Sequence, residues 1–578
     1  MTDLLHLYGT EEPPAEPPVR RVGALSFEWT GTGLRHVRLG GTELIRSVAF
    51  LARDRDWGTL TPEPGGVEET WTEGVLCLTT VLVFRTGGAS LTVALSVQAS
   101  ETGITLEATG NAAGAFETNR AGFTVLHPIT GQAGAPVSVT HSDGSEQHSV
   151  FPDLIAPWQP FMDIAAITHH AGDMACTCRF AGDVFEMEDQ RQWGDASFKT
   201  YNRPLARPWP YVIAAGEPLR QSVELSWRRA APVPAPTEPA LPSGPRFPDT
   251  ALVVTSDEAR RLAAGPDVLD AVAPQRLLCH LDATLGDVDG QCAAFATLQA
   301  AFPASTYDLE LIGAFDGDPE AELAAHARAA ANAGFSPASV MVCPSVDRQS
   351  TPPGSDWPDC PPLETIHAAA RAAFDAPVMG GGMASLFTEL NRKPPPSGML
   401  DFVTHALCPI VHDADDVSVM ETLEAVPHIT RSARALIGEA EYRIGPCTIA
   451  MRQNPYGSRT IPNPGGSRVC MTDNDPRHRG AFGAAYALGL ATALAPAGPS
   501  VWTPAAVFGP RGLFARDGTL LQVAEVIRAL AACAGRPVTE AAIRDGRARM
   551  TLGDTVFEAN LTPETKEGLP PFGWRSLF

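Results

Sequence analysis

The sequence of 578 residues lacks several features that would assign it to common classes of protein. It contains no run of about 18 apolar residues, so we expect no membrane-spanning helix. Its first residues, MTDLLHLYGTEEPPAEPP, do not place an apolar stretch after a basic start, which a secretory signal requires. Its eleven cysteines are scattered singly, unlike a disulfide framework. We therefore expect a reduced, cytoplasmic protein.

Basic residues are also scarce. Lys and Arg number 43 against 66 Asp and Glu, which gives a formal net charge of −23. Binding to nucleic acid depends on clustered Lys and Arg, and so does binding to an anionic membrane surface. We expect neither of these partners, and the sequence leaves the oligomeric state open.

Familiar catalytic and cofactor motifs are missing as well. The chain has no G-x-S-x-G nucleophile elbow and no H-E-x-x-H metal motif. Cys176 and Cys178 form a CxC pair without the further ligands of a structural zinc site. The glycines of 379–383, MGGGM, have neither the dinucleotide spacing nor a P-loop lysine. We expect no cofactor and no metal.

What is present changes character once along the chain. From 22 to 227, short alternating runs separated by Gly, Asn and Asp turns are typical of an antiparallel β-sandwich. After a Pro-rich spacer, seven apolar runs alternate with Ala-rich helical stretches, and 251–255 is a candidate for an eighth, which favours a (β/α)8 TIM-like barrel. The predicted fold is therefore multidomain, all-β followed by α/β. We predict a β-sandwich domain at 1–230, a Pro-rich linker at 231–248, a barrel at 249–540 and a short C-terminal β element at 541–578.

The segment 185–205, FEMEDQRQWGDASFKTYNRPL, mixes charges with large rings. Charged side chains are rarely buried unless they are paired, so this mixture indicates either a partly dry polar pocket or a structural salt-bridge cluster at a domain junction. Strand alternation places Glu186 and Glu188 on one face, where two neighbouring carboxyls can hold different pKa values. Arg191 or Lys199 could then keep one of them ionised or stabilise an oxyanion.

Candidates in the barrel follow from the rule that functional side chains gather at the C-terminal ends of its strands. Glu389 follows the glycine run closely and has polar neighbours. For Glu310, a structural charge paired inside the barrel explains the residue as well as a functional role does. For His127, the alternative to a functional role is a structural histidine whose hydrogen bonds are all made. The catalytic candidates are Glu389, Glu188 and Glu310, and the candidates for substrate contacts are Asp189, Arg191, Lys199, His127, His280, Asp282, Asn391, His412 and Arg452.

Several segments together resemble the D-apionate lactonase family of bacterial apiose catabolism. They are NRAGFTVLHP (119–128), FEMEDQRQWGDASFKTYNRPLARPWPY (185–211), FTELNR (387–392), THALCPIVHDADD (404–416) and IGPCTIAMRQNPYG (444–457). The resemblance runs from about 20 to 560, and more distantly the family is similar to (β/α)8-barrel glycoside hydrolases.

The resemblance implies hydrolysis of the γ-lactone of D-apionate to the open acid, while the roles of individual residues rest on chemistry alone. In the expected mechanism, Glu389 or Glu188 deprotonates a water that attacks the carbonyl, Arg or Lys stabilises the oxyanion, and a protonated carboxyl or His assists the ring oxygen. A glycoside hydrolase with two carboxylates and a non-catalytic carbohydrate-binding protein are the alternatives.

Overall fold

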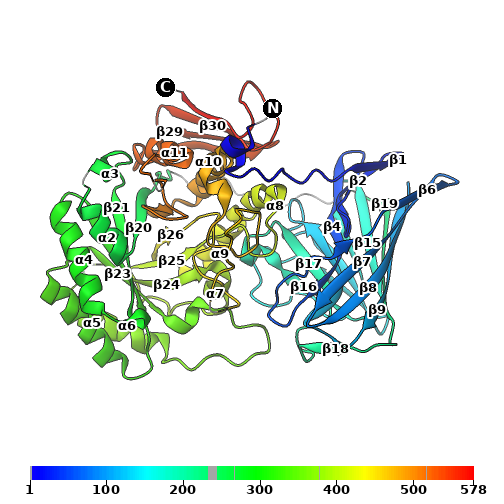
Figure 1. Cartoon of the computed structure of the whole chain (residues 1–578), viewed down its shortest axis with the longest axis horizontal. Helices are drawn as coiled ribbons and strands as arrows, with labels where there is room; N and C mark the ends of the chain where they lie inside the picture. Colours follow the sequence, from blue (N-terminus) through cyan, green and yellow to red (C-terminus); the bar gives the residue numbers. More distant parts are fainter. Residues whose placement is uncertain are drawn as a thin grey trace.

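The computed structural model describes residues 3–231, 244–265, 267–375, 378–457, 459–515 and 517–577. It contains an N-terminal antiparallel β-domain, a closed barrel of eight parallel strands and a small antiparallel C-terminal sheet (Figure 1). This architecture confirms the predicted fold class. Most of the linker predicted at 231–248 lies outside the described residues. Among the described residues, no helix is long and apolar enough to cross a membrane.

The β-domain owes its layers to side chains that alternate between buried and exposed positions, as in β7 and β8. Seventeen strands join one antiparallel hydrogen-bonded network, and β10 pairs separately with β18. The strands are β1 (Val19–Val22), β2 (Leu25–Trp29), β3 (Gly33–Leu39), β4 (Thr42–Arg53), β5 (Glu63–Pro64), β6 (Glu68–Thr72), β7 (Val75–Thr86), β8 (Ala89–Ser100), β9 (Gly103–Ala113), β10 (Phe116–Thr118), β11 (Arg120–Pro128), β12 (Pro136–His141), β13 (Glu146–Val150), β14 (Ile164–Ala171), β15 (Met174–Ala181), β16 (Phe185–Asp189), β17 (Ser197–Asn202), β18 (Tyr211–Ile213) and β19 (Leu219–Arg229).

Three adjacent strands of this domain depart from the alternation. β11, β16 and β17 are buried along nearly their whole length, on both faces. One face of these strands packs in the core of the sandwich, and the other faces the barrel. The contact with the barrel is made by the 3-10 turn η1 (Gln190–Trp193), which follows β16 and packs against α7 (Phe387–Arg392). Some polar residues of segment 185–205, among them Glu188 and Asp195, therefore lie between the two domains.

The barrel closes through parallel pairing of its first strand with its second and its last. Its strands are β20 (Asp249–Val254), β21 (Arg276–Asp282), β22 (Thr306–Gly313), β23 (Ser339–Pro344), β24 (Val378–Leu386), β25 (Phe402–Ala406), β26 (Glu441–Ile444) and β27 (Val501–Ala506). The uncertain eighth strand is therefore real and is the first one, β20. The remaining helices of this part are α2 (Ser256–Ala263), α3 (Asp267–Asp270), α4 (Val288–Ala301), α5 (Pro319–Ala333), α6 (Leu363–Ala373), α8 (Asp416–Glu421), α9 (Val426–Ile437), α10 (Ala481–Leu494) and α11 (Gln522–Ala531).

The glycine run in β24 allows the close approach that the sequence suggested. A Cβ on Gly380 would lie 2.2 Å from the ring of Phe402, and one on Gly382 would lie 2.2 Å from the carbonyl oxygen of Thr404. Gly382 also has a φ of 104°, which favours glycine. The register of β24 against β25 shifts after this residue, and α7 follows directly at the C-terminal end of the strand.

Both ends of the chain pack on one side of the barrel. The C-terminal sheet consists of β28 (Val538–Arg544), β29 (Arg547–Leu552), β30 (Thr555–Asn560) and β31 (Trp574–Leu577), and it packs against α10. The N-terminal helix α1 (Leu4–Tyr8) joins it there, with the ring of Tyr8 5.4 Å from that of Phe572. Figure 1 shows both termini above the barrel, at the C-terminal sheet and away from the sandwich strands.

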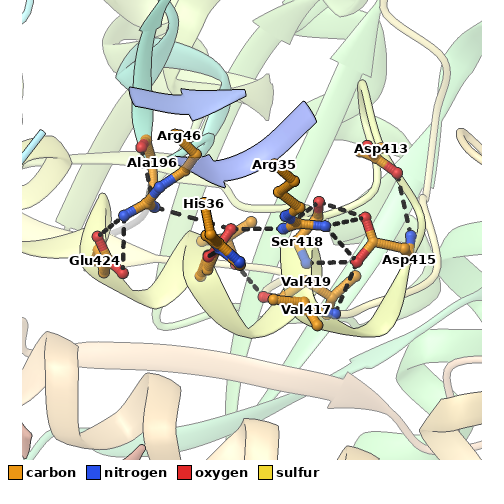
Figure 2. Close-up of polar contacts among 12 residues, drawn as sticks. Arg35, His36, Arg46, Ala196, Asp413, Asp415, Val417, Ser418, Val419 and Glu424 are labelled. Atoms are coloured by element: carbon orange, nitrogen blue, oxygen red, sulfur yellow. Dashed lines mark hydrogen bonds and ion pairs between the residues drawn. The ribbon is translucent and has the colours of Figure 1, made fainter. Parts of the chain in front are cut away.

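The sandwich docks on the barrel through a cluster of opposite charges (Figure 2). Arg35 donates to Asp415 at 2.8 Å and to Glu421 at 2.7 Å. His36 contacts Glu421 through Nε2 at 2.7 Å, and Arg46 reaches Glu424 of the turn η4 (Thr422–Glu424) at 3.1 Å. We name Arg35, His36, Arg46, Asp415, Glu421 and Glu424 the docking cluster.

Because His36 belongs to the docking cluster, we predict that the stability of the folded protein depends on the protonation of His36 and therefore on pH. Burial opposes its charge, but hydrogen bonds to Glu28 and Glu421 raise the pKa of His36 to about 9. A raised pKa gives stabilisation that is complete below the unfolded value near 6.5 and is lost as pH rises through about 9. His36→Asn should remove this contribution, and Asn tolerates the φ of 49° found there.

Thermal unfolding of wild type and His36→Asn between pH 6 and 10 checks this prediction. The variant should melt several degrees lower at pH 6, given about 2–4 °C per kcal/mol, and the two curves should converge towards pH 10. Parallel curves across the range would contradict a stabilising charge on His36.

Candidate active site at the junction of the sandwich and the barrel

The indole of Trp193 is the centre of a polar site at the domain junction. Its Nε1 donates to Glu188 at 2.8 Å. Its ring packs edge-on against His412 at 5.6 Å and in a tilted arrangement against Tyr456 at 5.2 Å, and both of these residues come from loops of the barrel. Arg392 of α7 lies over the same ring at 5.6 Å. One side chain of the sandwich thus contacts three segments of the barrel.

Glu188 is the carboxylate of this site. It pairs with Lys199 on the neighbouring strand at 2.8 Å, and an Nη of Arg392 lies 4.0 Å from its Oε1. Burial alone would raise the pKa of Glu188, but Lys199, His412 and Arg392 together hold it well below its usual value. Glu188 is therefore ionised at neutral pH. Lys199 and Arg392, the two cations beside Glu188, can also bind a second negative charge that forms next to them.

Glu389 stands in a different environment although it lies on the same helix as Arg392. It is 5% exposed, and its Oε2 accepts from the backbone N–H of Leu386 at 3.0 Å. Its Oε1 is buried without a hydrogen-bond partner among the described residues. Burial raises the pKa of Glu389 to about 7, with Arg392 opposing the shift. Such a carboxyl exchanges a proton near neutral pH.

The two glutamates belong to one site. Burial raises the pKa of Tyr456, and the charges of Glu188 and Glu389 both raise it further. Arg392 acts on both carboxyls, lowering the pKa of each. The structure therefore brings together the sandwich glutamate and the barrel glutamate that the sequence singled out separately.

His412 completes the barrel side of the junction. Its Nδ1 lies 2.6 Å from Oδ2 of Asp195, which belongs to the loop between η1 and β17. The amide of Gln190 lies 3.1 Å from the same nitrogen. Burial lowers the pKa of His412 below its usual value, and Asp195 opposes the shift.

Three cationic or polar residues of the junction were missed by the sequence reasoning. Arg120 lies over the ring of Tyr201 at 3.9 Å, and Arg53 is its cross-strand partner on β4. β11, which carries Arg120, lies next to β17, and β4, which carries Arg53, lies on the other side of β11; the register places both side chains on the face that carries Lys199. Tyr456 comes from the long connection between β26 and α10. The sequence offered only the flanking position of Arg120, because pairing across strands decides which side chains share a face.

Glu310, His280 and Arg452 form a separate cluster inside the mouth of the barrel. Glu310 contacts Nδ1 of His280 at 2.7 Å and accepts from Arg452 at 2.6 Å. Arg452 also donates to the carbonyl of Ala384 on β24. Burial would raise the pKa of Glu310, but Arg452 and His280 lower it to about 2. Both oxygens of Glu310 are occupied, which suits a fixed charge better than a proton carrier.

Other predicted contacts have structural partners. Asp282 pairs with Arg348 at 2.6 Å, and the Asn391 amide donates to the carbonyl of Ile155 at 3.3 Å. His127 is fully buried in the sandwich, with Nε2 2.9 Å from the hydroxyl of Thr200. This environment matches the structural-histidine reading rather than a substrate contact.

Asp189 and Arg191 also differ from the prediction, because both side chains are 0% exposed. They pair at 2.7 Å, and Arg191 further donates to the carbonyl of Pro152 and contacts His428. They are the structural salt bridge that was the alternative reading of segment 185–205. Strand alternation explains the division, since Glu188 faces the barrel and Asp189 faces inward.

The described residues contain no group of three or more His, Cys, Asp or Glu arranged to hold a metal ion.

Comparison with known proteins assigns the family. A model described as "D-apionate lactonase, N-terminal domain" matches residues 5–230, and one described as "D-apionate lactonase, TIM barrel domain" matches residues 250–535. A protein of Brucella anthropi named D-apionate lactonase is 46% identical over 524 residues, which cover 89% of this chain and 86% of that protein. The chain belongs to the D-apionate lactonase family. The resemblance noted in the sequence is thereby confirmed.

Solved structures resemble this member of the D-apionate lactonase family only distantly. A GH30 endoxylanase from Clostridium papyrosolvens is 9% identical and covers 55% of this chain and 83% of its own, with a TM-score of 0.36. A GH36 α-galactosidase from Geobacillus stearothermophilus is 10% identical and covers 94% and 91%, with a TM-score of 0.28. These scores carry no argument about function.

The buried pair predicts that Asp189→Asn impairs stability rather than substrate binding. Removing one partner leaves the charge of Arg191 buried without compensation, which costs about 3–5 kcal/mol. Thermal unfolding should show a large fall in melting temperature, while KM for the lactone should change less than about twofold in the folded protein. Asp173→Asn, in an exposed pair with Arg229, is the matched control. An unchanged melting temperature with a raised KM would restore Asp189 as a substrate contact.

Proposed function

We propose that this chain is a carboxylic ester hydrolase that opens the γ-lactone of D-apionate to the free acid in the cytoplasm. Its family and the name of its Brucella anthropi relative support this reaction. The substrate is a small neutral sugar lactone, and the product is an anion. The junction between sandwich and barrel is the proposed active site.

The observation that carries the assignment is that Oε1 of Glu389 is buried without a hydrogen-bond partner in the described part of the chain, in the same junction as the ionised Glu188. Glu389 titrates near pH 7, whereas Glu188 stays charged. Two carboxyls whose environments separate their pKa values divide acid and base work between them. Glu188 is too weak a base to take a proton from water, and Glu389 is protonated below about pH 7. We therefore assign Glu389 the general acid, which protonates the departing ring oxygen.

Lys199 and Arg392 suit the oxyanion that forms when water adds to the lactone carbonyl. Both are cations held beside Glu188. Preorganised cations in a partly dry site stabilise developing negative charge more strongly than they do in water. Glu188 then serves to keep both side chains in place.

Glu389→Gln should lower kcat by about a hundredfold or more while leaving the fold intact, because proton transfer commonly contributes that much. In the wild type, kcat/KM should fall as pH rises above about 7, since the acid is then ionised. This falling limb should be absent from the residual activity of the variant. Glu320→Gln, an exposed position on α5, is the control. Retention of the falling limb in Glu389→Gln would remove Glu389 from the mechanism.

The function itself is tested by supplying purified protein with D-apionolactone in weakly buffered indicator. A lactonase acidifies the solution, whereas a carbohydrate-binding protein only binds the sugar. Parallel arms with other aldonolactones and aryl glycosides test selectivity and the glycoside hydrolase alternative, and an arm with chelator tests for a metal. Release of aryl alcohol without any lactone opening would refute the proposal.

A further inference from the structure

His412 and Asp195 form a hydrogen-bonded pair at the junction. Neither residue has a role in the mechanism proposed for Glu188 and Glu389. The Asp195 carboxylate 2.6 Å from Nδ1 favours the tautomer with the proton on Nδ1 and the lone pair on Nε2, in which the Gln190 amide, 3.1 Å from Nδ1, makes no hydrogen bond to that nitrogen. Nε2 makes no hydrogen bond to any described residue. A histidine oriented by a carboxylate through Nδ1, with a free Nε2, is the arrangement of a general base.

The pair stands in the proposed active site rather than beside it. The ring of His412 packs on Trp193, whose indole is hydrogen bonded to Glu188. Three charged groups of the sandwich act on the imidazole of this barrel residue: Asp195 and Glu188 favour its protonated form, while Lys199 opposes it. Part of the surface of His412 and of Asp195 remains accessible.

From this geometry we infer that His412 is the general base that activates the attacking water, and that Asp195 is its positioning residue. The inference rests on the proposed function and supplies the proton acceptor that Glu188 cannot be. The pair forms only when the two domains are docked, because Asp195 belongs to the sandwich and His412 to the barrel.

The step balances as follows. The water oxygen bonds to the carbonyl carbon while one of its protons passes to Nε2, and the π electrons of the carbonyl move to its oxygen. When that oxyanion reforms the carbonyl, the bond to the ring oxygen breaks, and the ring oxygen takes the proton of Glu389. The proton on His412 then restores Glu389, and the product acid ionises with release of one proton to solvent.

The docking cluster holds both halves of the pair in place (Figure 2). Arg46 donates to the carbonyl of Ala196, the residue after Asp195, at 3.2 Å. Arg35 binds Asp415, which lies three residues after His412 and is tied to Asp413 by its backbone N–H at 3.2 Å. The segment of His412 is thus anchored across the interface by Arg35, and that of Asp195 is held by Arg46, which itself reaches Glu424 of the barrel.

The test compares wild type with His412→Gln, Asp195→Asn and the double variant on D-apionolactone over a range of pH. In the wild type, kcat/KM should rise with pH on the acid side, because His412 must be neutral to accept a proton. His412→Gln should lose about a hundredfold or more in kcat with KM within about threefold, and its rising limb should disappear. Asp195→Asn should lose tenfold or more, and the double variant should be no worse than His412→Gln.

His326→Gln is the matched control, since His326 pairs with Glu322 on α5, outside the junction. It should keep the wild-type rate and profile. If a His412 variant proves unstable in thermal unfolding, Asp195→Asn provides the decisive profile. A folded His412 or Asp195 variant that keeps both rate and rising limb overturns the inference while the lactonase function stands. A wild type that opens none of the lactones overturns both.

Discussion

The pairing of three sandwich cations with the acidic edge of α8 and η4 is the contact on which the candidate site depends. Arg35, His36 and Arg46 are largely buried, and each finds its carboxylate on the other domain. Charges buried this way are costly when separated, so the two domains hold one relative position. That position in turn sets the distance between groups that neither domain could align alone.

The junction is polar because both of its walls carry charges, and it is dry enough for those charges to matter. β11, β16 and β17 supply one wall, and α7 with the loops after β25 and β26 supplies the other. Glu188 pairs with Lys199 across a strand and lies near Arg392 across the interface. In such surroundings electrostatic interactions exceed those at an exposed surface, which explains the large pKa shifts concentrated there.

The sequence predicted the layers well because hydrophobic periodicity and the proline-rich spacer depend on local residues. It also picked out Glu188, Lys199, Glu389 and His412, since charges among rings and polar residues after buried strands are local signals too. It could not assign partners. Asp189 and Glu188 are adjacent in the chain, yet one belongs to a sealed salt bridge and the other to the junction. Arg53 and Tyr456 left no local signal, because strand pairing gives Arg53 its neighbour Arg120 and domain docking gives Tyr456 its neighbour Trp193.

One physical cause, removal from water, sets opposite shifts on the two groups proposed to move protons. Burial disfavours the charged form of any side chain, so it raises the pKa of Glu389 and lowers that of His412. Near neutral pH this favours a protonated carboxyl and a neutral imidazole, which are the forms that a general acid and a general base require. The pKa of Glu188 is not raised in the same way, because the neighbouring cations Lys199 and Arg392 help to lower it by more than burial raises it. In the proposed mechanism, burial is the main cause that prepares both the acid and the base, and the cations beside Glu188 stabilise the charge that forms on the substrate.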